Sequence, residues 1–262
     1  MTNSQPEYLT VGADATARRV AVRFQGGAGP GLFWLGGFNS DMKGTKAQAL
    51  ARWAADNGRA CLRFDYSGHG ESDGTLTDGT IGQWLQESLA VFAAYCRGPQ
   101  IVVGSSMGGW IALLLLRELR RAAAASGNAN AGSAAGLILI APAVDFTEIL
   151  MWEKFPRQVK REIMEKGVWA RPSAYSDNPY LITRQLIEEG RNHLVLGGMI
   201  EPGCPVRILQ GVADPDVPWS HAVELVSRIA RDDVVLTLVK DGDHRLSRDE
   251  DIERLLGAVA EF

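Results

Sequence analysis

The stretch from Gly104 to Gly109 constrains the fold of this chain more than any other feature of its sequence. It reads Gly-Ser-Ser-Met-Gly-Gly and fits the pattern Gly-x-Ser-x-Gly, with Ser106 at the centre. The β-branched residues 101–103 before it predict a buried strand, and the apolar residues 110–116 after it predict a buried helix. A strand, a sharp turn and a helix in this order are typical of a nucleophile elbow, which exposes a serine hydroxyl at a helix N-terminus. A glycine-rich turn with an incidental serine is the alternative.

The rest of the chain alternates between apolar strand-like segments and segments with helical spacing. This alternation predicts an α/β fold with one eight-stranded, mostly parallel sheet and helices on both faces. The first two strands have only a polar turn between them, so we expect an antiparallel start. Residues 122–136 are rich in small side chains and predict a surface loop. The predicted strands are 8–11, 20–24, 32–35, 60–64, 101–103, 137–141, 206–210 and 234–239, and the principal helices are 46–57, 84–95, 220–230 and 248–262.

One region, residues 143–205, breaks the alternation because it contains no convincing strand. Helix-end signals predict one helix between Pro156 and Gly167 and another from Asn178-Pro179 to Gly190. Since this insertion follows the sixth strand, it should lie over the carboxyl edge of the sheet, where the elbow emerges. We therefore expect a core of residues 7–142 and 206–262, with a small helical lid formed by residues 143–205.

Large apolar side chains are frequent in this predicted lid. Trp152, Trp169 and Tyr175 are candidates to contact a substrate from its underside. The alternative is that these aromatic side chains only pack a small core within the insertion, as large apolar side chains mostly do.

A serine hydroxyl needs a base to become a good nucleophile, and His244 is the predicted base. Where an elbow serves catalysis, the chain order is serine, acid, histidine. His244 lies in the loop between the last strand and the last helix, at the sheet edge where Ser106 should emerge. His69 precedes the elbow in a polar turn, His193 lies in the lid, and His221 starts a helix.

The acid that orients the base should follow the seventh strand, which points to Asp214. Its carboxylate would accept a hydrogen bond from Nδ1 of His244 and leave Nε2 facing Ser106. The alternatives are Asp216, Asp145, Asp241 and Asp243, which otherwise suit turns and caps.

Two backbone N–H groups are needed to stabilise an oxyanion. One should belong to Met107, the residue after the nucleophile, and the other to the loop after the third strand. Gly36-Gly37 in that loop allow close backbone approach, and Phe38 N–H is the predicted second donor. A plain glycine turn is the alternative for this loop.

Composition narrows the possible partners. The 262 residues carry a formal net charge of −4 with acids and bases interspersed, so we expect no nucleic-acid binding. The three cysteines show no Cys-x-x-Cys spacing, which favours a reducing compartment and predicts neither a metal site nor a cofactor. The sequence shows no signal peptide and no apolar run long enough to span a bilayer, so we expect a cytoplasmic location. The oligomeric state stays open.

Together these segments resemble the α/β-hydrolase family over nearly the whole chain. The resemblance is narrower to a branch of mitochondrial acyl-protein thioesterases, also described as acyl-glucuronide esterases, and to their bacterial relatives. It implies the hydrolysis of S-acyl or O-acyl esters. The matching segments are Gly36-Gly37-Phe38, Gly44-Thr45-Lys46-Ala47, residues 64–72, residues 104–110, Lys166-Gly167-Val168-Trp169 with Pro172-Ser173, Asp214 with Val217-Pro218-Trp219, and Asp243-His244-Arg245.

The sequence therefore predicts a cofactor-free serine hydrolase that acts on a small-molecule acyl ester or acyl thioester through an acyl-enzyme. The same three side chains could instead support C–C bond hydrolysis, acyl transfer or perhydrolysis. A non-catalytic binding protein on a hydrolase scaffold is the third hypothesis.

Overall fold

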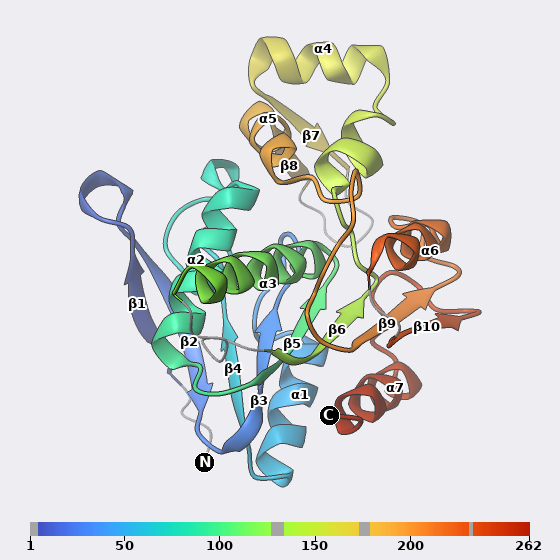
Figure 1. Cartoon of the computed structure of the whole chain (residues 1–262). Coiled ribbons are helices and arrows are strands. Elements are labelled where there is room, and N and C mark those ends of the chain that lie inside the picture. Colours follow the sequence, from blue (N-terminus) through green and yellow to red (C-terminus); the bar gives the residue numbers. More distant parts are fainter. Residues whose placement is uncertain (1–4, 127–133, 173–178, 231–232) are drawn as a thin grey trace.

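The computed structural model describes residues 5–126, 134–172, 179–230 and 233–262 and has one large sheet at its centre (Figure 1). Strand β2 is antiparallel to β1 and to β4, and all other neighbours in this sheet are parallel. The predicted eight-stranded, mostly parallel sheet with an antiparallel start is confirmed. In spatial order the strands are β1 (Glu7–Val11), β2 (Arg18–Gln25), β4 (Arg59–Phe64), β3 (Ala28–Leu35), β5 (Gln100–Ser105), β6 (Ala134–Ile140), β9 (Val206–Gly211) and β10 (Val234–Val239).

Helices cover both faces of this sheet, as its near-continuous apolar strands require. Residues of α2 (Ile81–Tyr95), α3 (Met107–Ser126) and α6 (Trp219–Arg228) share one buried cluster with one side of the strands. Residues of α1 (Thr45–Asp56) and α7 (Asp249–Ala260) share a second cluster with the other side. The sheet is therefore the middle of three layers.

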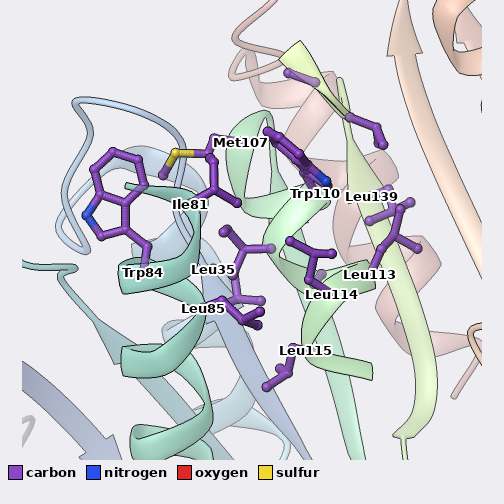
Figure 2. Packing of buried hydrophobic residues seen from close by; sticks show 14 of the residues in the cluster. Leu35, Ile81, Trp84, Leu85, Met107, Trp110, Leu113, Leu114, Leu115 and Leu139 are labelled. Carbon is purple, nitrogen blue, oxygen red and sulfur yellow. The ribbon is translucent and has the colours of Figure 1, made fainter. Parts of the chain in front are cut away.

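Large, buried apolar side chains lie below the elbow. Figure 2 shows Leu35 of β3 and Leu139 of β6 beside Trp110, Leu113 and Leu114 of α3, all at most 4 % exposed. Burial of each large apolar side chain contributes about 1.5–3 kcal/mol before the cost of ordering it. This packing fixes the start of α3, and hence the elbow, relative to the carboxyl ends of β3 and β5.

The described residues of the segment 143–205, which are 143–172 and 179–205, form a small layer above the carboxyl edge of the sheet (Figure 1). The expectation that this region contains no strand was wrong, because β7 (Val168–Arg171) pairs antiparallel with β8 (Tyr180–Thr183). The helix predicted from Asn178 begins later, as α5 (Arg184–Gly190), where the Thr183 hydroxyl accepts from Leu186 N–H at 3.1 Å. The first predicted lid helix is present as α4 (Arg157–Lys166), and a π-helical turn, η3 (Thr147–Trp152), precedes it.

The predicted loop 122–136 is shorter than expected at both ends. Helix α3 continues to Ser126 and β6 begins at Ala134, while residues 127–133 lie outside the described part of the chain. Alanine has the highest helix propensity, so residues 122–125 prolong α3 instead of ending it. No helix of the described residues is both long enough and apolar enough to cross a membrane.

Candidate active site

Ser106 occupies a strained turn between β5 and α3. Its φ is 54°, in the left-handed region that side chains rarely adopt. Glycines on either side make this turn possible: a Cβ on Gly104 would lie 2.4 Å from the Gly108 oxygen, and one on Gly108 would lie 2.1 Å from the Leu35 oxygen. The geometry is that of the predicted nucleophile elbow.

His244 lies in the loop between β10 and α7, as predicted, and faces the elbow. Its Nε2 is 2.9 Å from the Ser106 Oγ, across 138 positions of sequence. The loop lies directly against the end of β9, where a Cβ on Gly211 would come 2.3 Å from the Gly242 oxygen. Ala213 N–H donates to that same oxygen at 3.0 Å, which ties the histidine loop to the loop of the acid.

Asp214 completes the relay on the far side of the imidazole. Its Oδ2 is 2.8 Å from His244 Nδ1, and the side chain of Asp214 is fully buried. Its other oxygen accepts from the N–H groups of Asp216 and Val217, both at 2.9 Å. These bonds fix the carboxylate so that it holds one histidine tautomer, with the Nδ1 proton toward Asp214 and the Nε2 lone pair toward Ser106.

The four alternative acids have other partners. Asp216 pairs with Arg171 of the lid at 3.4 Å, and Asp241 pairs with Arg248 at 2.7 Å. The remaining two carboxylates accept backbone N–H groups: Asp145 those of Val195 and Leu196, and Asp243 those of Arg245 and Leu246.

The three other histidines are likewise engaged elsewhere. His69 is buried beside Phe38 and Trp84, and its burial lowers its pKa to about 4. His193 meets Glu189 within the lid at 2.6 Å. His221 donates to the Val144 oxygen at 2.9 Å, and burial lowers its pKa. All three are structural in this arrangement.

The two predicted oxyanion donors lie beside Ser106. Met107 begins α3, and the loop of Phe38 approaches the serine so closely that a Cβ on Gly37 would lie 3.3 Å from the Ser106 Cβ. Neither N–H meets a backbone acceptor among the described residues, while Ser40 N–H donates to Gly37 O at 3.3 Å. Two unpaired backbone donors beside a nucleophile suit a developing negative charge.

A cavity of about 690 Å³ opens over Ser106 and His244. Its two sides differ in chemistry. The lid side, which we call the lid wall, is mainly apolar: Ala143, Phe146, Leu150, Met151, Arg171, Pro172 and Tyr180. The lining residues from β3, the loop after it, the start of α1 and the loop of His244, which we call the α1 wall, are mainly polar: Trp34, Ser40, Asp41, Thr45, Lys46, Arg245 and Ser247.

The lid aromatics predicted to contact substrate do not form this lid wall. Trp152 lies under the cations of Lys160 and Arg191, at 5.5 and 5.1 Å, and Trp169 packs edge-on against Phe155 at 5.1 Å. Neither tryptophan is among the described residues that line the cavity, so the expectation that these two contact substrate there was wrong. Both are partly buried and pack against the large apolar cluster that also contains residues of α2 and α3. Tyr175 lies outside the described residues.

Sequence reasoning missed Gln210, which supports the acid. This side chain is fully buried at the end of β9, and its amide nitrogen lies 3.2 Å from Asp214 Oδ2 and 3.0 Å from the Val217 oxygen. A glutamine directly after the apolar pair Ile208-Leu209, four positions before an aspartate, was the available signal.

One group of side chains has the spacing of metal ligands among the described residues. Donor atoms of Asp214, Asp216 and His244 all lie within 4.8 Å of one another. However, His244 and Asp214 already share a hydrogen bond, and Asp216 pairs with Arg171. Because a cation would replace the proton between His244 and Asp214, these contacts describe an acid–base pair and not a metal centre.

The fold and this geometry agree with the comparison with known proteins. The Alpha/beta hydrolase family matches residues 26–258. The chain belongs to the α/β-hydrolase family.

Among its relatives is "Palmitoyl-protein thioesterase ABHD10, mitochondrial". The Bos taurus protein is 38% identical and the Homo sapiens protein 37% identical, each over 234 residues, which is 89% of this chain and 72% of the relative. Two solved structures are each similar over 98% of this chain and 98% of their own chain. An Agrobacterium vitis S4 protein matches with a TM-score of 0.93 and 47% identity, and mouse alpha/beta hydrolase domain-containing protein 10 with 0.83 and 34%.

Proposed function

We propose that this α/β hydrolase is a serine hydrolase that cleaves acyl esters or acyl thioesters with Ser106, His244 and Asp214 as its catalytic triad. The observation that carries the proposal is the unbroken relay from the Ser106 hydroxyl through the imidazole to a buried carboxylate, with hydrogen bonds of 2.9 and 2.8 Å. The relay opens onto a cavity large enough for a small acyl compound.

The reaction follows from the roles of these groups. Neutral His244 accepts the Ser106 proton at Nε2 as the oxygen attacks the acyl carbonyl, and Asp214 stabilises the imidazolium that forms. The N–H groups of Phe38 and Met107 hold the oxyanion of the tetrahedral intermediate. His244 then gives its proton to the leaving sulfur or oxygen, and an acyl group stays on Ser106. A water deprotonated by His244 releases the acid and restores the serine.

The acyl group has an apolar place to lie. The lid wall offers Phe146, Leu150, Met151 and Tyr180 directly above the elbow, and burial of an alkyl chain there is favourable by roughly 0.8 kcal/mol for each methylene removed from water. The mitochondrial relatives are described as palmitoyl-protein thioesterases, which supports a fatty acyl thioester as the substrate class.

The decisive experiment is labelling with a fluorophosphonate, followed by peptide mapping. We expect one adduct on Ser106, its loss in Ser106→Ala, and its retention in Ser105→Ala, which changes the neighbouring serine. No adduct on Ser106 in folded protein would contradict the proposal and favour a non-catalytic binding protein. A panel of nitrophenyl esters, acyl thioesters, C–C substrates and alternative acceptors then separates hydrolysis of esters from C–C hydrolysis, acyl transfer and perhydrolysis.

A further inference from the structure

The α1 wall contains a buried donor without an acceptor. Trp34 of β3 is only 4 % exposed, and its indole Nε1 has no hydrogen-bond partner among the described residues. A Cβ on Gly36 would lie 3.7 Å from this nitrogen and 3.3 Å from the Ser40 Oγ, and both Trp34 and Ser40 line the cavity. Buried indole N–H groups nearly always find an acceptor, so this unpaired donor suits an acceptor atom supplied by a ligand.

The start of α1 adds further donors to the same wall. Thr45, Lys46 and Ala47 form the first turn and line the cavity, and no backbone acceptor is described for their N–H groups. The cap residue Gly44 provides no side-chain acceptor. The N-terminus of a helix of 12 residues carries partial positive charge and favours an anion.

A lysine at this position strengthens that charge. Lys46 Nζ donates to the backbone oxygen of Arg245 and to Ser247 Oγ at 3.3 Å, which leaves one of its three donors for the cavity. A cation in the first turn opposes the dipole of its own helix, so helix stability does not explain its presence. The one acid on this wall, Asp41, accepts a bond from Lys43 N–H at 2.7 Å.

The catalytic histidine defines which part of the substrate meets this wall. His244 must protonate the leaving atom, and Arg245 and Ser247 of the α1 wall belong to the same loop as His244. The acyl chain has the lid wall on the other side. The leaving group therefore extends toward Trp34 and Lys46.

We propose that the α1 wall is a subsite for a leaving group that bears an oxyanion, either a carboxylate or a phosphate, held by Trp34 Nε1, Lys46 and the N–H groups at the start of α1. This inference rests on the proposed function, since it concerns the substrate of the same site. In this arrangement the two parts of the cavity lining bind different parts of the substrate: the lid wall selects the acyl chain and the α1 wall selects the leaving group.

The test compares octanoyl thioesters that differ only in the thiol. One pair is 3-mercaptopropionate and its methyl ester, and the other is phosphopantetheine and pantetheine. For each pair, the ratio of kcat/KM for the charged over the neutral member is measured in the wild type, in Trp34→Phe and in Trp53→Phe. Trp34→Phe keeps an aromatic ring but removes the donor. The control, Trp53, lies in α1 under the cation of Arg59 and is not among the described residues that line the cavity.

We expect Trp34→Phe to lower this ratio about tenfold for one pair, as loss of a hydrogen bond to a charged group does, and Trp53→Phe to leave it unchanged. The pair that responds identifies carboxylate or phosphate. An unchanged ratio in both pairs, or an equal loss with charged and neutral substrates, would overturn the subsite. If fluorophosphonate does not label Ser106, the proposed function is contradicted, but the subsite is not yet tested. In that case, calorimetry measures the binding of the charged and neutral thioesters to Ser106→Ala. Equal affinities for the two members of each pair would overturn the subsite.

Discussion

The carboxyl edge of the sheet and the lid above it line one cavity, but they are held in place in different ways. At the sheet edge, Ser106 is fixed between glycines whose neighbours leave no room for a Cβ, and Asp214 is fixed by several hydrogen bonds. The lid is a two-stranded sheet with short helices, and it leaves Met164 and Leu181 each 39 % exposed.

Polar contacts join the lid to the core, in addition to a shared apolar cluster in which Ile182, Leu186 and Ile187 of the lid pack with residues of α2 and α3. Glu189 accepts from Gly82 N–H at the start of α2 at 3.1 Å, and Trp110 of α3 donates to the His193 oxygen at 3.1 Å. Asp145, whose φ is 54°, accepts hydrogen bonds from the N–H groups of Val195 and Leu196. These bonds hold the first and last parts of the lid segment together. From this difference we expect the proposed reaction to depend on the rigid edge and the choice of acyl chain to depend on the lid. Changes at the edge should therefore affect every substrate, and changes in the lid should affect only selectivity.

The largest effect should come from Asp214→Asn. An amide cannot hold the reactive histidine tautomer, so kcat should fall by about 10⁴ for all substrates. Asp216→Asn is the matched control in the same loop, because Asp216 pairs with Arg171 and not with His244, and it should lose less than about tenfold. Steady-state kinetics on short and long acyl substrates measure both. Equal losses in the two variants would contradict the assignment of the acid.

Next in size is the effect of Gly108→Ala on stability. The new Cβ would lie 2.1 Å from the Leu35 oxygen and 2.5 Å from the Gly36 oxygen. Both are backbone atoms, so the clash can be relieved only by moving the main chain. We expect a loss of about 3 kcal/mol or more in the free energy of unfolding, measured by urea denaturation. Gly257→Ala in α7 is the control: its Cβ meets nothing within 4 Å, so it should stabilise the protein by about 0.5–1 kcal/mol.

A smaller effect is expected at the α1 wall, where the preference for charged over neutral thioesters should depend on pH because of Lys46. Burial and the neighbouring Arg245 lower the Lys46 pKa to about 8, against the opposing influence of Asp243 and Asp251. The ammonium is therefore charged below about pH 8 and loses its charge as the pH rises through that value. For the responsive thioester pair, the ratio of charged to neutral kcat/KM should fall several-fold between pH 7 and 9. Lys46→Arg should keep the ratio constant over this range, and a fall that persists in Lys46→Arg would contradict the role of Lys46.

The smallest effect should come from the lid wall. Leu150→Ala widens a partly exposed part of the lid wall and should shift the preferred acyl chain with a change of about threefold in relative kcat/KM. Trp169→Leu, whose ring packs on Phe155, should leave the chain-length profile unchanged. Competition among butanoyl, octanoyl and hexadecanoyl thioesters measures the profile. A larger shift in Trp169→Leu than in Leu150→Ala would restore the tryptophan as a substrate contact.

The difference between the sheet edge and the lid also explains which features could be predicted from the sequence. The elbow has a local signature, because only glycine fits at residues 104 and 108, and His244 follows from its place after the last strand of the sheet. The alternation of apolar strands and helices was equally local, and it predicted the eight-stranded, mostly parallel sheet with helices on both faces, though not the spatial order of the strands.

The lid could not be predicted in the same way. Strands β7 and β8 have four residues each, too few to show a period, and Asn178-Pro179 resembled a helix start. The position of Trp169 depends on Phe155, a contact that no spacing in the sequence reveals. The role proposed for Trp34 likewise depends on a contact between distant segments, because Trp34 and the start of α1 line the same cavity.

The most direct test of the central claim is to observe the acyl group on the protein. Wild-type protein is mixed with an excess of an octanoyl thioester, quenched in acid within milliseconds, and analysed by intact mass and peptide mapping. The account predicts a mass increase of one octanoyl group on the peptide that contains Ser106, absent in Ser106→Ala. Turnover that persists in Ser106→Ala, or an acyl group found only on another side chain, would contradict it.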